Sequence, residues 1–293
     1  MVRSLCGVFA AVVTAAPAAA VELPFHDCDG LICFDATIDG KAHTLALDTG
    51  DTNSVLLTDT AKALGWKLDP IERNGQPLKG VSLAGEHDIG VGSGTLKASF
   101  ITLDRDKFGE QASGIEGLLD YTALKDRVLR IDYPHHTLQI SDVVTAPASK
   151  VPAPGTLKLI TFGKKGPPIV VGGPFMVNGK PLQAQIDTCY TGTLLIYDAA
   201  LAGLGLSKQG NAQFFAHTDG GVNMLAGQAR SIGFGKQTIM AKQPPLYFVD
   251  EASKNPVHQP DALFEGTVGN ALFTHSVVTL DFHAMTLDVQ PAS

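Results

Sequence analysis

Residues 45–57 read LALDTGDTNSVLL, so that an Asp-Thr-Gly lies between two apolar runs. Residues 184–196 read AQIDTCYTGTLLI and place a second Asp-Thr directly after an apolar run. Short apolar runs that are bounded by small polar residues are typical of buried β-strands joined by turns. We therefore expect Asp48 and Asp187 each to lie on a tight turn at the end of a strand.

The surroundings of the two motifs form an internal repeat. Asp39-Gly40 aligns with Asn178-Gly179, and both dipeptides are typical of two-residue hairpin turns. After each Asp-Thr come an apolar strand and a short helical run, TDTAKALG in the first copy and YDAALAGLG in the second. The aligned segments recur in the same order: 34–59 with 174–198, 87–104 with 229–250, and 117–140 with 266–289. A repeat of this kind predicts two similar lobes.

The spacing of turns and apolar runs predicts an all-β fold with two similar β-rich lobes and one motif aspartate in each. Residues 143–156 contain three prolines and resist regular structure, which indicates a linker. We expect an N-terminal lobe over 21–142 and a C-terminal lobe over 157–293.

The first 20 residues are typical of a secretory signal peptide. Arg3 is followed by an apolar run and then by small residues that end at Ala20, which predicts cleavage near Ala20. The run is too short to span a bilayer, and no later stretch is long enough to do so. The mature protein is therefore expected in the periplasm or outside the cell.

Composition excludes several classes of function. The net charge is −7 with no basic patch, which argues against a nucleic-acid partner. The nine histidines show no metal-ligand spacing, and we expect neither a metal nor another cofactor.

Cys28 and Cys33 could pair in an oxidising compartment or could be two free core thiols, and Cys189 has no obvious partner. The oligomeric state is left open.

A duplicated β lobe with one Asp-Thr motif per copy resembles the aspartic peptidases, in particular their short-loop bacterial branch. The resemblance covers about residues 25–290 and implies that each lobe is a β-barrel of the acid-protease type. It implies that Asp48 and Asp187 share one proton and activate a water that attacks a peptide bond. It also implies that Thr49 and Thr188 bond across to the opposite loop.

The same resemblance implies that an extended peptide or protein substrate lies in a cleft between the lobes. Flap hairpins are expected near 75–86 and 213–228, where the second range includes Phe214, Phe215 and His217. Gly50 fits the family pattern, since a glycine leaves room for backbone N–H groups beside the carboxylates.

The sequence departs from the family pattern near both motifs. Cys189 occupies the position of a glycine, Asp120 stands where the second copy has Gly269, and Asp51 and Tyr190 replace small residues. A second hypothesis is therefore a degenerate fold that binds envelope peptides without cleaving them. A third makes Cys189 a reactive thiol, although two adjacent carboxylates would raise its pKa and suppress the thiolate.

Overall fold

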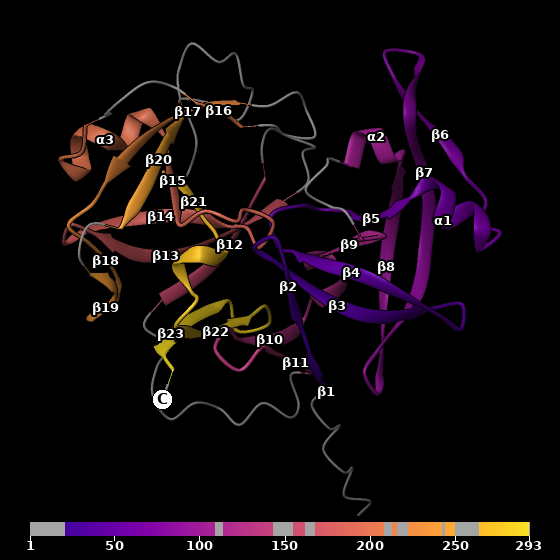
Figure 1. The fold of residues 1–293 in the computed structure, drawn as a ribbon, viewed down its shortest axis with the longest axis horizontal. Helices are drawn as coiled ribbons and strands as arrows, with labels where there is room; N and C mark the ends of the chain where they lie inside the picture. The colour runs from indigo at the N-terminus through magenta and orange to yellow at the C-terminus, as the bar shows by residue number, and fades with distance from the viewer. Residues whose placement is uncertain are drawn as a thin grey trace, which may run out of the picture.

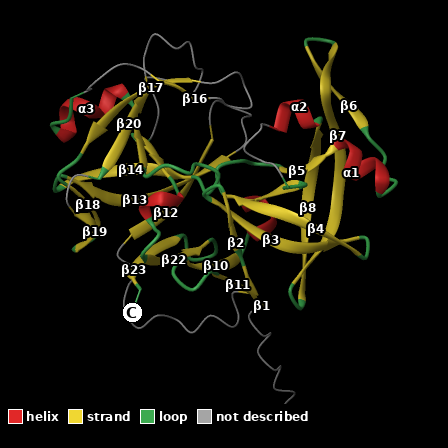
Figure 2. Cartoon of the chain, viewed as in Figure 1, coloured by secondary structure: helices red, strands yellow, loops and turns green. Residues whose placement is uncertain are grey.

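The computed structural model describes residues 21–108, 114–142, 155–161, 168–207, 213–215, 222–241, 244–249 and 264–292. These residues form two β-rich halves that lie side by side, with only short helices (Figures 1 and 2). The predicted all-β, two-lobe fold is thus confirmed. Among the described residues, no helix has both the length and the apolar character needed to cross a membrane. The predicted signal peptide and most of the predicted linker lie outside these residues.

The first half is built on a sheet of eight strands within the described residues. Its order is β2-β3-β4-β9-β5-β8-β7-β6, with an additional pairing of β3 and β7. The strands are β2 (His26–Cys28), β3 (Leu31–Ile38), β4 (Lys41–Asp48), β5 (Ser54–Leu57), β6 (Asp69–Arg73), β7 (Gln76–Val91), β8 (Gly94–Leu103) and β9 (Gly117–Asp120). Helices α1 (Thr58–Ala63) and α2 (Arg105–Phe108) accompany this sheet.

The other described strands belong to a second, larger sheet. They are β1 (Val21–Pro24), β10 (Arg127–Asp132), β11 (Thr137–Asp142), β12 (Gly155–Thr161), β13 (Pro168–Val177), β14 (Lys180–Ile186), β15 (Leu194–Ile196), β16 (Gln213–Phe215), β17 (Val222–Gln228), β18 (Ser231–Phe234), β19 (Gln237–Ala241), β20 (Pro245–Val249), β21 (Gly266–Val268), β22 (Ser276–Asp281) and β23 (Thr286–Pro291). Helix α3 (Asp198–Leu204) follows β15.

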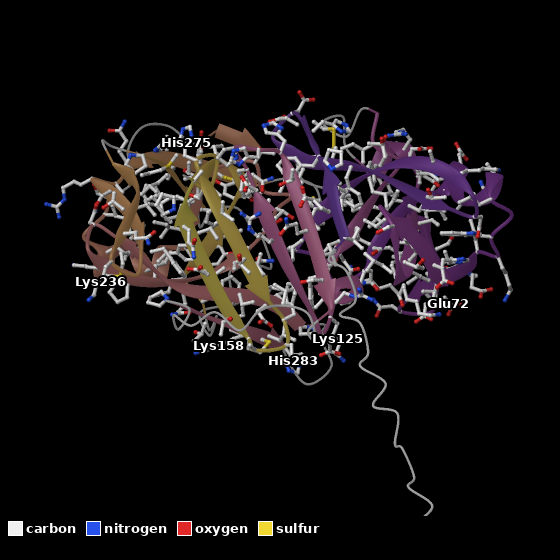
Figure 3. All side chains as sticks on the ribbon, turned by 90° about the horizontal axis from the view of Figure 1, so that it is seen from below. Glu72, Lys125, Lys158, Lys236, His275 and His283 are labelled. Carbon is white, nitrogen blue, oxygen red and sulfur yellow. A yellow bond between two sulfur atoms is a disulfide. The ribbon has the colours of Figure 1, made fainter. Side chains whose placement is uncertain are left out.

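This larger sheet joins the two halves of the chain. Strand β10 pairs with β22 in antiparallel register, and Val128 lies opposite Asp281. Figure 3, seen from below, shows the yellow strands of the C-terminal segment beside the pink strands of the first half. One apolar core cluster includes Phe34 and Phe100 from the first half and Phe175 and Phe234 from the second. The halves therefore share both a sheet and a core.

The turns form where the dipeptides predicted them. Asp39 and Gly40 have φ values of 49° and 77°, and Asn178 and Gly179 have 53° and 80°. Left-handed φ at both central positions is the requirement of a tight hairpin turn, which Asn, Asp and Gly meet most easily. The predicted short helices are also present, and the second ends at Gly205 with φ 66°.

The first flap hairpin begins earlier in the chain than 75–86. Strands β6 and β7 pair across a turn at Asn74-Gly75, so residues 76–86 are only the second strand of that hairpin. Asn74 and Gly75 have φ values of 54° and 74°, which explains why the chain turns there. In the second range, β16 pairs with β17 as a hairpin. The side chains of Phe214, Phe215 and His217 lie outside the described part.

Candidate active site

Each motif aspartate lies at the end of a central strand. Asp48 is the last residue of β4, which runs parallel to β9 and pairs Asp48 with Asp120. Asp187 directly follows β14, which runs parallel to β21 in the second half. A strand with neighbours on both edges is rigid, so both turns start from well-fixed positions.

The threonines of the two turns bond to each other across the halves. The backbone N–H of Thr49 donates to Oγ1 of Thr188 at 3.0 Å, and that of Thr188 donates to Oγ1 of Thr49 at 3.2 Å. The Thr49 hydroxyl in turn donates to the carbonyl of Ile186 at 2.8 Å, and the Thr188 hydroxyl to that of Leu47 at 2.7 Å. Four bonds with two-fold character therefore hold the turns in register.

Each carboxylate also closes its own turn. Oδ1 of Asp48 accepts the N–H groups of Gly50 at 2.9 Å and Asp51 at 3.1 Å. Oδ1 of Asp187 accepts the N–H groups of Cys189 at 2.8 Å and Tyr190 at 3.1 Å. The two aspartates thus have the same local bonds, and these bonds fix the orientation of each carboxyl group.

The two carboxyl groups interact electrostatically. A Cβ added to Gly50 would lie 2.6 Å and 2.7 Å from the two carboxyl oxygens of Asp187, so the first turn packs directly on the second carboxylate. The pKa of Asp48 is raised well above its usual value by burial, then by the charge of Asp187 and that of Asp51. Two carboxyl groups this close resist losing both protons, because the two negative charges would repel each other, so the pair retains one proton.

Cys189 lies between the two motif aspartates and is half-buried. Its thiol donates a long hydrogen bond of 3.8 Å to the carbonyl of Leu47. The pKa of the thiol is raised well above its usual value, first by burial and then by Asp48 and Asp187. The thiol therefore stays protonated, which argues against a reactive thiolate. Its counterpart Gly50 has no side chain, so the two turns differ at this position.

Asp120 has a structural environment that the sequence did not indicate. Its carboxyl is fully buried and accepts a hydrogen bond of 2.6 Å from the Ser54 hydroxyl and one of 3.1 Å from the Thr122 N–H. It thereby caps the 3₁₀ turn Tyr121–Leu124. In the second copy a Cβ on Gly269 would clash with the Tyr190 carbonyl, so a side chain fits only in the first copy.

Two further residues contact the turns and were missed from the sequence. Gln185 donates from its side-chain amide to the Gly50 carbonyl at 3.0 Å. Asn270 donates to the carbonyl of Thr188 at 2.6 Å. The signal for Asn270 is its place directly after Gly269 in the repeat, where the first copy has Tyr121 after Asp120.

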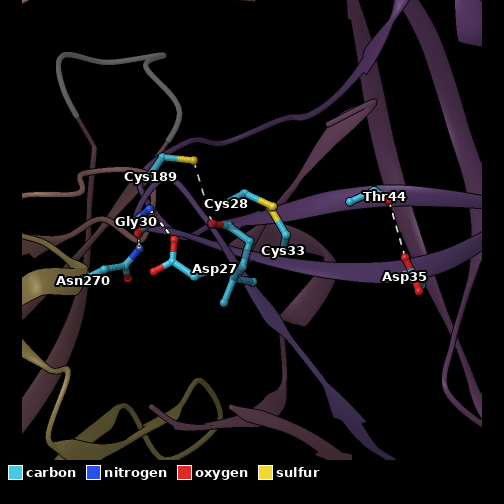
Figure 4. The surroundings of a disulfide bond; sticks show 9 residues. Asp27, Cys28, Gly30, Cys33, Asp35, Thr44, Cys189 and Asn270 are labelled. Carbon is cyan, nitrogen blue, oxygen red and sulfur yellow. Dashed lines mark hydrogen bonds between the residues drawn. A yellow bond between two sulfur atoms is a disulfide. The ribbon is translucent and has the colours of Figure 1, made fainter. Parts of the chain in front are cut away.

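Tyr190 packs its ring over Gly192, and its hydroxyl is buried without a hydrogen-bond partner among the residues that the structure describes. Cys28 and Cys33, whose pairing the sequence left open, form a disulfide near Cys189 (Figure 4). His26 lies next to this disulfide and completes a group of three potential metal ligands whose ligand atoms lie within 4.8 Å of one another. The sulfurs of that group are already bonded to each other.

The chain resembles a solved structure over nearly its whole length. No family model and no curated protein matches it in sequence. The crystal structure of an aspartic proteinase from Irpex lacteus superposes with a TM-score of 0.52 at 14% identity, covering 94% of this chain and 98% of that one. At this identity the likeness is one of fold. The chain therefore has the two-lobe, all-β fold of pepsin-like aspartic proteinases.

Proposed function

We propose that the protein is an aspartic endopeptidase in which Asp48 and Asp187 activate a water molecule. The observation that carries the proposal is the pair of equivalent Asp-Thr turns, joined by reciprocal threonine bonds from residues 139 apart. Such an arrangement fixes two carboxylates close together, which is the geometry that general acid–base hydrolysis of an amide needs.

Burial and mutual charge favour a single proton shared by the two carboxyls. Asp48 is 5% exposed and its pKa is raised by burial and by the charge of Asp187, which is itself half-buried. The ionised carboxyl of the pair takes a proton from the attacking water, while the protonated one polarises the peptide carbonyl of the substrate. The proton taken from the water then passes to the leaving amine, and neither a covalent intermediate nor a metal takes part in these steps.

The substrate would be a peptide or protein segment in extended conformation. The hairpin of β6 and β7 projects from the first half (Figure 1), and we assign it as the flap of the proposed enzyme. An extended peptide that bonds to a strand edge gains affinity from its main chain. Cleavage-site profiling measures which side chains the enzyme prefers on either side of the scissile bond.

The proposed place of action is the periplasm or the extracellular space. The disulfide between Cys28 and Cys33 is compatible with an oxidising compartment. The apolar N-terminal segment that ends near Ala20 supports export, and cleavage there would give a mature chain that begins at Val21. N-terminal sequencing of the exported protein tests this proposal directly.

A second candidate is a peptide-binding protein that does not cleave its ligand. The observation in its favour is Cys189, whose side chain occupies space beside the pair that a glycine would leave free. Such a protein would retain the fold and bind extended peptides, but it would show no turnover at any pH.

Asparagine substitutions separate the two functions. The mature protein is incubated with a mixed peptide library over a pH series, with and without pepstatin, and products are identified by mass spectrometry. Asp48→Asn and Asp187→Asn should each abolish cleavage while circular dichroism shows an intact fold. Asp35→Asn, at an exposed carboxylate on β3, is the matched control and should leave activity unchanged. Full activity in either motif variant would refute the assignment of the pair.

A further inference from the structure

The side chain of Asn270 connects the Asp187 turn to the first half of the protein. It is 5% exposed, and its amide nitrogen donates both to the Thr188 carbonyl at 2.6 Å and to the Gly30 carbonyl at 2.8 Å. Its oxygen accepts a hydrogen bond of 2.9 Å from the Tyr133 hydroxyl. The backbone N–H of Asn270 bonds to the carbonyl of Tyr190 at 2.9 Å. Asn270 therefore contacts two residues of the Asp187 turn.

The partner of Asn270 in the first half is the tip of a small hairpin. Strands β2 and β3 meet at Asp29-Gly30, where both residues have left-handed φ, and Asp27 accepts the Gly30 N–H at 2.7 Å (Figure 4). A Cβ on Gly30 would lie 3.0 Å from the side chain of Thr191, so the tip also packs on the Asp187 turn. The hairpin therefore reaches this turn at two points.

The disulfide closes this hairpin. Strand β2 lies at the edge of its sheet and pairs only three residues with β3. A short edge strand of this size opens easily without a cross-link. Cys28–Cys33 removes that freedom, because it ties β2 to β3 within six residues. Cys33 in turn lies opposite Ala46 on β4, two residues before Asp48.

We propose that Asn270 and the disulfide-closed hairpin of residues 26–33 are positioning elements that hold the Asp187 turn against the first half. This inference rests on the proposed peptidase function, because the turn carries one of its two carboxylates. The first turn has no such support from the residue at the equivalent place in the repeat. That residue, Tyr121, donates its hydroxyl to the Pro168 carbonyl on β13 at 2.8 Å, so its side-chain hydrogen bond is made to β13 and not to the Asp48 turn.

The difference between the two turns has a physical reason. Asp48 is buried at the end of a strand, whereas Asp187 lies beyond the end of β14 and is only half-buried. The second turn also carries the bulk of Cys189 in place of a glycine. A reacting group that is displaced by about 1 Å can lose roughly a hundredfold in rate, so additional support at this turn matters for catalysis.

Hydrogen exchange measured by mass spectrometry tests the positioning role without relying on activity. The probes are peptides that cover the N–H groups of Cys189 and Tyr190, compared with those that cover Gly50 and Asp51. Asn270→Ala should raise exchange at the second turn by about tenfold or more and leave the first turn unchanged. Replacing both Cys28 and Cys33 with alanine should do the same to a smaller degree.

A pair of hydroxyl deletions provides a milder test and a matched control. Tyr133→Phe removes the donor to Asn270, and it should raise exchange at the Asp187 turn. Tyr121→Phe is the control: it removes a hydroxyl bond between the halves at the position that aligns with Asn270 in the repeat. It should leave exchange at the Asp187 turn unchanged. Unchanged exchange at Cys189 and Tyr190 in both Asn270→Ala and Tyr133→Phe would overturn the positioning role.

Kinetics then connect the positioning role with the reaction. In Asn270→Ala, kcat should fall about 10- to 100-fold while KM changes less than about threefold, because the substrate still binds and only the reacting group is misplaced. A rise in KM with kcat unchanged would show that substrate binding is weakened instead, and it would overturn the assignment to Asp187. If exchange responds as expected but even the unaltered protein cleaves no peptide, the proposed function fails while the positioning role stands.

Discussion

Gly50→Ala is the smallest substitution that should displace the proposed catalytic pair. The added Cβ would lie 2.4 Å from the carboxyl carbon of Asp187 and 2.6 Å and 2.7 Å from its two oxygens, whereas ordinary van der Waals contact begins at 3.4 Å. The carboxyl group must therefore move by about 1 Å to relieve the contact of its carbon with the Cβ. Gly50 does not have a left-handed φ, so alanine meets no backbone strain there. The effect of the methyl group is therefore confined to its contact with the carboxylate.

The displacement sets the size of the expected loss. A shift of about 1 Å in a reacting group can cost roughly a hundredfold in rate, so this displacement should lower kcat by about 30- to 100-fold. This corresponds to a rise of about 2–3 kcal/mol in the activation free energy. Because the clash involves a side chain at a half-buried position, the melting temperature should fall by only a few degrees, or about 1 kcal/mol.

The assay measures kcat on one cleaved peptide, together with thermal melting of the same preparations. The matched control is Gly203→Ala in α3, where a Cβ would contact nothing and φ is ordinary. There the same substitution should leave kcat unchanged and raise stability by up to about 1 kcal/mol. If Gly50→Ala keeps full kcat with an intact fold, the Asp187 carboxylate is not held against the first turn during the reaction, and the geometric argument fails.

Three other predictions concern the groups around the pair. Cys189→Gly should raise kcat because it frees space at the second turn, and Cys189→Leu should lower kcat. Loss of activity in the glycine variant would contradict this prediction. Loss of activity in both variants, together with inactivation of the unaltered protein by alkylation, would favour a thiol mechanism. Asp51→Ala removes a negative charge that raises the pKa of Asp48, so the upper limb of the pH–rate profile should move to lower pH; an unchanged limb would mean that the Asp51 charge is screened. Since the folded-state pKa of Asp48 is raised, its protonated form stabilises the fold at low pH, and that stability is lost as pH rises through the raised pKa. Asp48→Asn should therefore increase the free energy of unfolding in urea at pH 7 and have little effect at pH 3, with each unit of pKa shift worth about 1.4 kcal/mol; equal effects at both pH values would argue against a buried charged carboxyl.

Local features of the fold could be predicted from the sequence because their causes are local. The Asp-Gly and Asn-Gly turns at 39–40 and 178–179 follow from the few residues that accept left-handed φ. The strands before Asp48 and Asp187 follow from short apolar runs, and the two-lobe organisation follows from the repeat of these patterns. The predicted range 75–86 of the first flap was wrong, because the chain turns at Asn74-Gly75, where both residues have left-handed φ, and residues 76–86 continue as a strand.

Contacts between distant segments depend on the tertiary structure. The bonds between Thr49 and Thr188 were expected only from the resemblance to a family, since no rule of spacing relates residues 139 apart. The pairing of Cys28 with Cys33 stayed open because a disulfide needs a geometry that separation in sequence does not fix.

Asp120 and Asn270 are two further residues whose roles depend on the tertiary structure. In the sequence alone, Asp120 is a departure from a glycine pattern and Asn270 is an ordinary polar residue. Their roles come from partners that the chain brings close only on folding: the Ser54 hydroxyl for one, and the Gly30 carbonyl, 240 residues away, for the other. The sequence by itself determined which segments are strands and where they turn, since backbone dihedral preferences and side-chain burial act over a few residues. Only the packing of the two halves decided which polar groups would be buried together, because each buried group must find its hydrogen-bond partner in three dimensions.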